Sequence, residues 1–583
     1  MCGIFGYVGK DNAIKKVIRG LEKLEYRGYD SAGLAYIKQK NIEVLKSVGK
    51  VENLKVLSCA LSSNLSIAHT RWATHGKASE INCHPHTSKN FAIVHNGIIE
   101  NFEFLKKNLK YKFYSETDTE VVAKLLEENL KNTTKFFETE KAILHAIKET
   151  QDLLKGSWAI ALICKIDPNK IYVFKNKSPL VLGKAENGSY VASDMNAIEE
   201  DLDFVNLEDE NIAIVEKDKV EIFDKNLMLI NPETIRKNEQ VIKENRIFPH
   251  KMIKEINEIP RALCETKKLL ENDDFCNLAK MFENFSEITI IGCGTAYHAG
   301  LYGKYILEKF TNKKVDVVLA SEYRYKTQIR RENELVVAIS QSGETADTLA
   351  GISLAKKLGA KTVGITNVSS SSLTRECDFN LHTNAGAERA VAATKSYVCQ
   401  VYVLYLLACK IAGEIPQDNL DKITEKFIKD FDKNFFNKYF HKQKFFFIGR
   451  LCDGSTAFEG ALKLKEIAYV HSEGYPAGEL KHGTLSLVDE QSLVIAIITQ
   501  EDIKEKTLNA VHEVMARGAD VLVITQFDDL DFVGDMILLP KVSQEIEPLV
   551  SVVPLQLFAY EYSLSKGLNP DMPRNLAKSV TVE

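Results

Sequence analysis

Two groups of residues in this 583-residue chain have the types and spacing for chemistry, and they lie far apart in the sequence. The first group begins at Cys2. Removal of Met1, which aminopeptidases carry out before a small second residue, would leave a thiol and an α-amino group on one residue. Because an α-amino group titrates near ~7.7–8.0, a neutral fraction is available to accept the thiol proton. The pattern predicts an N-terminal nucleophile, although a cysteine at position 2 taken alone can be accidental.

Further residues of the N-terminal segment could hold a substrate beside that nucleophile. In HNGIIEN, Asn96 and Gly97 follow the strand-like FAIV and could present a side-chain amide and a backbone N–H at one turn. Such a pair can form an oxyanion hole, in which one donor is worth about 2.7–4 kcal/mol. Arg71 could bind an α-carboxylate, and Asp118 could pair with an α-ammonium. Each residue also has an ordinary role, since Asn-Gly is the commonest hairpin turn and the others suit turns or caps.

The second group begins after the strand-like ELVVAI, where SQSGET precedes the helical pattern ADTLAGISLAKKLG. Hydroxyls and free N–H groups at a helix N-terminus can bind phosphate without a lysine, although the same residues can form a simple N-cap. A second glycine-rich turn, GCGT, also lies between a strand and a helix. We predict that phosphate is bound by Ser340, Gln341, Ser342 and Thr345, with Thr295 of the second turn added to them.

Other signals argue against metals and nucleotide cofactors. Five histidines lie between His69 and His95, but their spacing matches no regular ligand pattern. The turn at Gly292 does not continue as GxGxxG, and no GxxxxGK[ST] occurs. We therefore expect no metal and no cofactor.

The N-terminal motifs CGIFGYVG, LEYRGYDSAG, HTRWATHG, HPH, HNGIIEN and SETDTE together resemble the class II (N-terminal-nucleophile, Ntn) glutamine amidotransferases. The resemblance implies Cys2 as the nucleophile and Asn96 with Gly97 as the oxyanion hole. It also implies that L-glutamine is held by Arg71, Thr74, His75 and Asp118.

The motifs SQSGETADT and GCGTAYHAG resemble sugar isomerase (SIS) domains. With EGALKLKE, GELKHG and the terminal PRNLAKSVTVE, the resemblance covers nearly the whole chain and extends to amidotransferases that act on D-fructose 6-phosphate. It implies that Lys578 forms an imine with this sugar, that Glu466 moves a proton between C1 and C2, and that His482 opens the ring. In the resembled family this histidine comes from the neighbouring subunit, which implies a homodimer.

Several of these residues have plainer alternatives. Lys463 lies three residues before Glu466, on the same helix face, and the two could form an exposed ion pair. Lys578 could be a solvated lysine of the tail. The resemblance also implies an ammonia path gated by Trp72 and bordered by Ala577, whereas Trp72 could equally pack in a core.

The sequence departs from the resembled pattern at two positions. Ala296 and Ala393 stand where some relatives carry serine, and each loses a hydroxyl that could touch the sugar or its phosphate. Three other functions remain open on the sequence: a related amidotransferase, a sugar-phosphate-binding regulator, and a glutaminase uncoupled from synthesis. The first would need a phosphoribosyl-pyrophosphate or ATP-pyrophosphatase signature, and the sequence shows neither; the other two would not need Lys578.

The strand-like and helical patterns around these residues predict three folded domains. Short β-like runs with a few helical patterns over residues 2–220 indicate an α+β domain, which the resemblance makes an Ntn-hydrolase-type sandwich. Residues 221–250 are rich in Lys, Asn and Glu and are predicted to be a linker. Buried-type strands then alternate with helices over 280–415 and again over 440–572, which predicts two α/β SIS domains with parallel sheets. The resemblance makes residues 573–583 a catalytic tail.

Composition indicates a metabolic protein of the cytoplasm. The formal net charge is −5, so no basic field favours nucleic acid. The start lacks the layout of a signal peptide, and the longest apolar run, Val401–Cys409, is too short for a membrane span and fits a buried helix. Eleven cysteines without a CxxC pair favour reduced thiols over disulfides.

Overall fold

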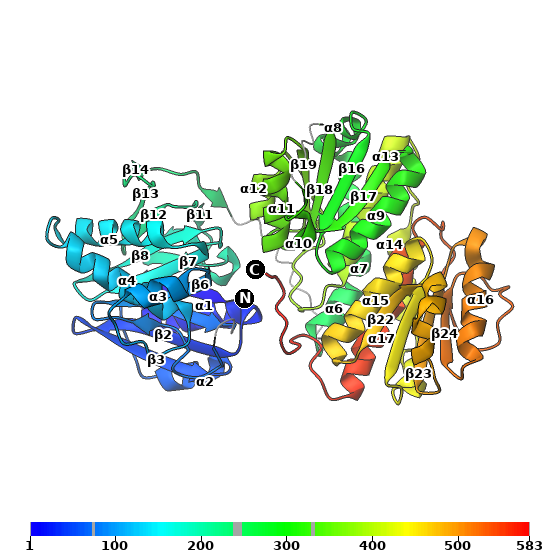
Figure 1. The fold of residues 1–583 in the computed structure, drawn as a ribbon, viewed down its shortest axis with the longest axis horizontal. Helices are drawn as coiled ribbons and strands as arrows, with labels where there is room; N and C mark the ends of the chain where they lie inside the picture. The colour runs from blue at the N-terminus through cyan, green and yellow to red at the C-terminus, as the bar shows by residue number, and fades with distance from the viewer. Residues whose placement is uncertain (1, 73–75, 237–247, 328–332, 582–583) are drawn as a thin grey trace. The chain divides into compact units, whose positions relative to one another are not determined.

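The computed structural model describes residues 2–72, 76–236, 248–327 and 333–581, and its chain divides into two compact units (Figure 1). The first unit comprises residues 1–243 together with 579–583, and the second comprises residues 244–578. Cys2 belongs to the first unit and Lys578 to the second. The two candidate sites therefore belong to different units.

The first unit contains two antiparallel sheets. One has the order β15-β11-β9-β10-β1-β4-β2-β3 and the other β14-β13-β12-β8-β7-β6-β5. The strands of the first sheet are β1 (Gly3–Gly9), β2 (Ser31–Lys38), β3 (Asn41–Val48), β4 (Leu65–Arg71), β9 (Val181–Ala185), β10 (Gly188–Ala192), β11 (Asp203–Asn206) and β15 (Ile235–Arg236). Those of the second are β5 (His86–Thr87), β6 (Phe91–Ile99), β7 (Gly156–Cys164), β8 (Asp167–Asn176), β12 (Ile212–Val215), β13 (Val220–Phe223) and β14 (Leu229–Ile230).

The two sheets pack face to face and carry helices on their outer faces. Alternation along β1 sends Ile4 and Val8 into the core between the sheets, whereas Phe5 and Tyr7 pack with the outer helices. The helices are α1 (Ala13–Leu24) and α2 (Val51–Ser58) on the first sheet, with α3 (Phe102–Asn108), α4 (Asp118–Thr133) and α5 (Thr139–Leu153) on the second. The predicted α+β sandwich is confirmed.

The predicted linker is wrong over its first half. Residues 221–236 include β13, β14 and β15, which pair with the sheets of the first unit, and Ile222 is buried in the core between the sheets. These strands are only two to four residues long, so their alternation is too brief to distinguish from a loop. Residues 237–247 lie outside the described part of the chain.

The second unit contains two parallel sheets with the same strand order. The first sheet runs β17-β16-β18-β19-β20 and the second runs β22-β21-β23-β24-β25, so the chain repeats one topology. The first five strands are β16 (Glu287–Gly292), β17 (Lys314–Leu319), β18 (Glu334–Ser340), β19 (Lys361–Thr366) and β20 (Phe379–His382). The second five are β21 (Lys444–Gly449), β22 (Ser472–Pro476), β23 (Ser492–Ile498), β24 (Asp520–Thr525) and β25 (Asp535–Leu538). Two predicted SIS-type sheets are confirmed.

Helices cover both sheets and join them through one continuous core, which includes Ile290, Leu404, Leu464 and Leu555. They are α6 (Lys251–Asn257), α7 (Ile259–Lys267), α8 (Asp273–Phe282), α9 (Thr295–Thr311), α10 (Ala320–Tyr323), α11 (Ala346–Lys357), α12 (Ser372–Glu376), α13 (Lys395–Ala412), α14 (Leu420–Asp430), α15 (Cys452–Ala468), α16 (Lys504–Met515) and α17 (Glu547–Ser565). The apolar run Val401–Cys409 is a buried part of α13, as predicted. Among the described residues, no helix is both long and apolar enough for a bilayer crossing.

Candidate catalytic sites

Cys2 lies directly before β1, beside the end of β4. The pairing of Gly3 with Thr70 brings Trp72 next to it, and the Trp72 N–H donates to the Cys2 sulfur at 3.3 Å. Cys2 is a half-buried residue, and burial of its thiol raises the pKa of that group. A thiol with a raised pKa needs a base to become a nucleophile, which is the role predicted for the α-amino group. Met1 lies outside the described residues.

Asn96 and Gly97 occupy the middle of β6, not a turn. They pair with Ala159 and Trp158 of β7, so both the predicted turn and the hairpin alternative are wrong. Gly97 has φ +132°, and a Cβ there would lie 2.0 Å from the Ser157 carbonyl oxygen, which requires glycine. The Asn96 side chain is buried, and among the described residues its Oδ1 has no hydrogen-bond partner. A strained glycine beside an unpaired buried amide oxygen is more typical of a functional site than of ordinary strand pairing.

Arg71 and Asp118 are buried near the same strands. The guanidinium of Arg71 donates to the carbonyl oxygens of Gly76 and Lys77 at 3.1 and 3.3 Å. Asp118 opens α4, and its Oδ2 accepts the Ile99 N–H at 2.9 Å, so it also ties β6 to this helix. Trp72 packs edge-to-face on Tyr29, with ring centroids 5.8 Å apart. The predicted ligands Thr74 and His75 lie outside the described residues.

Four of the five histidines between His69 and His95 form a buried cluster behind this site. His69 and His84 are parallel at 4.1 Å, and His95 continues the stack. Burial lowers the pKa of His69 to about 3 and those of His84 and His86 well below the usual value, so these rings are neutral. His95 Nδ1 and His86 Nε2 each lie 2.9 Å from a threonine hydroxyl at the start of α4. In the described part of the chain no cluster of metal-ligating side chains could hold an ion. The histidine rings instead form hydrogen bonds that hold β5 and β6 to the start of α4.

In the second unit, the hydroxyls predicted to bind phosphate gather between β18 and α11. Ser340 is the last residue of β18, and its Oγ lies 2.9 Å from Thr345 Oγ1 and accepts the Gly343 N–H at 3.1 Å. Ser342 accepts the Glu344 N–H at 3.2 Å. Thr345 is the N-cap residue of α11, but its side chain makes no cap hydrogen bond. The arrangement fits an anion site at a helix N-terminus; Gln341 lies in the same loop.

The predicted pair Lys463 and Glu466 belongs to a buried network that joins α15 to α9. The Lys463 ammonium lies 3.2 Å from Glu459 and 2.7 Å from Glu466, and it donates to Thr295 Oγ1 at 3.0 Å. Glu459 also accepts from Thr295 at 3.0 Å and lies 2.8 Å from His298 Nδ1. The hydroxyl of Thr295 therefore binds both charged groups, in addition to any predicted contact with phosphate.

The charges of this network are strongly shifted by its burial. Burial raises the pKa of Glu466, and the ammonium groups of Lys463 and Lys578 only partly offset this effect. Burial would lower the pKa of Lys463, but Glu459 and Glu466 outweigh it and raise the pKa. A carboxylic acid with a raised pKa beside a fixed cation can take up and return a proton. The sequence prediction missed Glu459 and His298, although Glu459 stands one helical turn before Lys463 in EGALKLKE.

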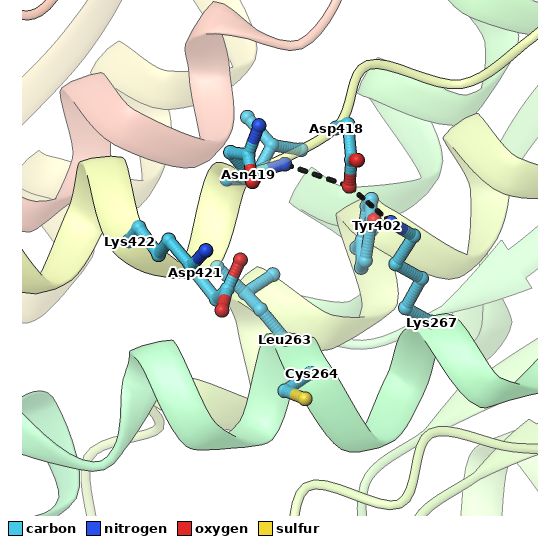
Figure 2. A pocket seen from close by; sticks show the side chains of 9 residues that line it. Leu263, Cys264, Lys267, Tyr402, Asp418, Asn419, Asp421 and Lys422 are labelled. Atoms are coloured by element: carbon cyan, nitrogen blue, oxygen red, sulfur yellow. Dashed lines mark hydrogen bonds and ion pairs between the residues drawn. The ribbon is translucent and has the colours of Figure 1, made fainter.

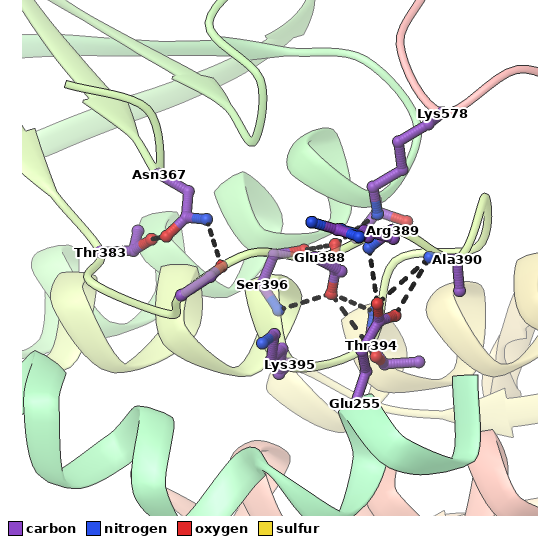
Figure 3. A network of polar contacts seen from close by, with 12 residues as sticks. Glu255, Asn367, Thr383, Glu388, Arg389, Ala390, Thr394, Lys395, Ser396 and Lys578 are labelled. Atoms are coloured by element: carbon purple, nitrogen blue, oxygen red, sulfur yellow. Dashed lines mark hydrogen bonds and ion pairs between the residues drawn. The ribbon is translucent and has the colours of Figure 1, made fainter. Parts of the chain in front are cut away.

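Lys578 is buried and forms an ion pair with Glu388, so the alternative of a solvated tail lysine is wrong (Figure 3). Its charge also acts on Glu466, which places the two predicted groups within electrostatic range. His482 ends the 3₁₀ turn Ala477–His482 and is exposed. Within the described residues no hydrogen bond or ion pair joins it to Lys463, Glu466 or Lys578.

Ala296 is buried and Ala393 is half-buried, both beside this site's elements. Ala296 lies in the first turn of α9, and Ala393 precedes α13. Figure 2 shows a separate surface pocket between α7 and the start of α14, where Lys267 pairs with Asp418. None of the predicted site residues lines it. It is therefore no part of the candidate sites.

The comparisons with known proteins agree with this division. The glutamine amidotransferase domain model matches residues 69–200, and the SIS domain model matches residues 281–410 and 438–566. The C-terminal domain of glucosamine-fructose-6-phosphate aminotransferase from Francisella tularensis is 34% identical, with a TM-score of 0.51, and covers 57% of this chain and 100% of that chain. Fold and matches together define a glutamine amidotransferase domain joined to a double SIS unit.

Full-length relatives narrow the class further. The glutamine–fructose-6-phosphate aminotransferase (isomerizing) of Caldanaerobacter subterraneus subsp. tengcongensis is 42% identical over 100% of both chains. The protein of the same name from Aquifex aeolicus is also 42% identical over 100% of both chains. The chain belongs to the glutamine–fructose-6-phosphate aminotransferase (isomerizing) family.

Proposed function

We propose that the protein converts D-fructose 6-phosphate and L-glutamine into D-glucosamine 6-phosphate and L-glutamate, the first step of hexosamine (UDP-GlcNAc) synthesis. The observation that carries the proposal is the presence, in one chain, of a thiol site at Cys2 and a buried lysine-carboxylate site at Lys578 and Glu466. The family supports both halves of the reaction. A sugar-binding regulator would need neither the thiol nor the buried lysine.

At the first site, Cys2 attacks the side-chain amide carbon of glutamine. The α-amino group freed by removal of Met1 accepts the thiol proton and passes it to the leaving ammonia. Asn96 and the Gly97 N–H stabilise the oxyanion, and water then hydrolyses the thioester to glutamate. Glutamine is held by Arg71, Thr74, His75 and Asp118.

At the second site, Lys578 forms an imine with the opened sugar, and ammonia then replaces the lysine at C2. Glu466 takes a proton from C1 and returns it to C2, which turns the ketose derivative into an aldose. Its raised pKa supports this role. The phosphate is bound by Ser340, Gln341, Ser342, Thr345 and Thr295.

The assembly that we propose is a homodimer in the cytoplasm. His482 is exposed in this chain, which suits donation to the partner's site for ring opening. Ammonia passes from Cys2 to the sugar, with Trp72 as the gate and Ala577 at its border, as the resemblance implies. The eleven cysteines are all free thiols, which suits a reducing compartment.

The test is a product assay with purified protein, L-glutamine, and D-fructose 6-phosphate present or absent, without metal or nucleotide. Glucosamine 6-phosphate and glutamate should form in equal amounts when the sugar is present. Lys578→Arg should keep glutamine hydrolysis but lose both the sugar product and the borohydride-trapped sugar adduct. Glutamate without any sugar product from the wild-type protein would contradict the proposal, as would trapping of the sugar at another lysine.

A further inference from the structure

Glu388 is a wholly buried carboxylate that no predicted role uses. It lies between β20 and α13, and its side chain has no exposed surface. Its Oε1 accepts the N–H groups of Thr394 and Ser396, each at 3.0 Å, at the start of α13. Its Oε2 accepts the Ser396 hydroxyl at 2.7 Å and pairs with Lys578 (Figure 3). The carboxylate is thus fixed on all sides with one oxygen aimed at the lysine.

These contacts keep Glu388 ionised. Burial alone would raise its pKa, but the Lys578 ammonium and the donors of Ser396 and Thr394 lower it to about 2. A helix N-terminus adds a favourable field for the negative charge. The carboxylate therefore stays negative throughout the pH range in which a protein of this kind works.

The other charged groups near Lys578 have contacts of their own, and Glu388 is the one that pairs with it. Glu255 of α6 accepts the backbone N–H groups of Arg389 and Ala390, and burial together with Glu388 raises its pKa to about 7. Lys395 of α13 is bound to Glu258 at 2.6 Å. Glu466 of α15 lies within electrostatic range of Lys578 but binds Lys463. Among the described residues, Glu388 is the carboxylate that directly contacts the Lys578 ammonium.

We propose that Glu388 is the counter-ion of Lys578 and of the protonated imine that Lys578 forms with the sugar. The inference rests on the proposed function. When the ammonium condenses with the C2 carbonyl, a C–N bond forms, the C–O bond breaks, and the oxygen leaves as water with two nitrogen protons. The nitrogen carries one positive charge before and after. Glu388 can therefore pair with both states without gaining or losing a proton, and it acts as a positioning residue.

A protonated imine is what the next step requires. Ammonia attacks C2 of the Lys578 imine, and the electron pair of the C=N bond moves onto the positive lysine nitrogen, whereas a neutral imine is a poor acceptor. An opposite charge at hydrogen-bond distance favours the charged form by about 1–3 pH units. Glu388 is thus expected to keep the adduct cationic under conditions in which an isolated imine would lose its proton.

The experiment measures trapping of the sugar adduct by cyanoborohydride, which reduces the protonated imine, as a function of pH. The adduct at Lys578 is quantified by mass spectrometry after incubation with D-fructose 6-phosphate alone. In Glu388→Gln the whole pH profile should move about 1–3 units toward acid, because ammonium and iminium both lose their counter-ion. Glu258→Gln is the matched control, since it removes a nearby half-buried carboxylate that binds Lys395 and not Lys578, and its profile should coincide with that of the wild type.

A second variant covers the case in which Glu388→Gln fails to fold. Ser396→Ala removes one neutral donor from the same carboxylate oxygen, so the remaining charge acts more strongly on the lysine. Its profile should shift slightly in the opposite direction, toward alkaline pH, with hydrolysis of glutamine unchanged. Profiles that lose amplitude without moving in pH would overturn the counter-ion role. Wild-type protein that traps no sugar would instead overturn the proposed function itself.

Discussion

The ammonium of Lys463 lies 2.7 Å from the carboxylate of Glu466, one turn further along α15, and the lysine side chain is completely buried. The three-residue spacing of Lys463 and Glu466 was also compatible with an exposed ion pair. That alternative is wrong, because Lys463 is buried. A second carboxylate, Glu459, lies on the other side of the lysine at 3.2 Å. Burial would raise the pKa of Glu459, but Lys463 and His298 lower it, whereas the pKa of Glu466 stays raised by burial, as proton transfer needs.

Replacement of Glu466 should separate the two activities. Glu466→Gln keeps the shape of the side chain but cannot carry a proton from C1 to C2, so synthesis of the sugar product should fall about 10²–10⁴-fold. Hydrolysis of glutamine should be unchanged. Lys465→Gln, at an exposed position of the same helix, is the control and should retain both activities. Sugar synthesis within a few-fold of wild type in Glu466→Gln would remove the residue from the proton transfer.

Loss of the Cys2 thiol should have the opposite pattern. Cys2→Ala should abolish glutamine hydrolysis and glutamine-driven synthesis, whereas ammonium salts should still support synthesis because the Lys578 site is intact. The exposed Cys59 provides the control variant, Cys59→Ala, which should behave as the wild type. Product formation by Cys2→Ala with glutamine as the sole nitrogen source would contradict the coupling of the two sites.

Local patterns predicted the sheets and helices well. The repeated strand sequences led to two parallel sheets because buried parallel strands are continuously apolar, a signal that does not depend on distant partners. The α1 helix was visible because Ile14, Val17, Ile18, Leu21 and Leu24 all face the core. Strands of two residues such as β14 have no such signal, since only their partners in the sheet define them.

The sites were predicted less completely, because several of their groups are defined by contacts across the chain. Glu388 lies 190 residues from Lys578, and no spacing rule connects them. His298 is joined to Glu459 in the same way, by packing of α9 against α15. Asn96 and Gly97 were found by type, but their strand conformation depends on pairing with β7.

Glu255 should make the stability of the protein depend on pH. Its pKa is about 7 in the folded state against an ordinary value of 4.5, so between these pH values the folded state holds a proton that the unfolded state has lost. The free energy of unfolding therefore falls as the pH rises from 4.5 to 7, by roughly 3 kcal/mol at most, and the loss is complete above pH 7.

The variant Glu255→Gln removes this titration while its amide oxygen can still accept the Arg389 and Ala390 N–H groups. The difference in Tm, variant minus wild type, should be larger at pH 8 than at pH 5. Thermal unfolding at the two pH values measures it. Glu265→Gln, at a half-exposed glutamate of α7, should show no such change between the two pH values. A difference in Tm that is independent of pH in the Glu255 variant would show that this carboxyl does not titrate in the folded protein.

Gly97 should tolerate no side chain. In Gly97→Ala the new Cβ would meet the Ser157 carbonyl oxygen at 2.0 Å, and φ +132° is strained for any L-residue, so β6 must shift away from β7. The displaced N–H should lower glutamine hydrolysis at least 10²-fold, as expected for loss of an oxyanion donor. Gly413→Ala is the matched control, because Gly413 has φ +73° but an added Cβ would meet no other residue within 4 Å, and it should cost only about 1–2 kcal/mol of backbone strain. Measured kcat values for glutamine hydrolysis that are equal in the two variants would show that the Gly97 N–H takes no part in the reaction.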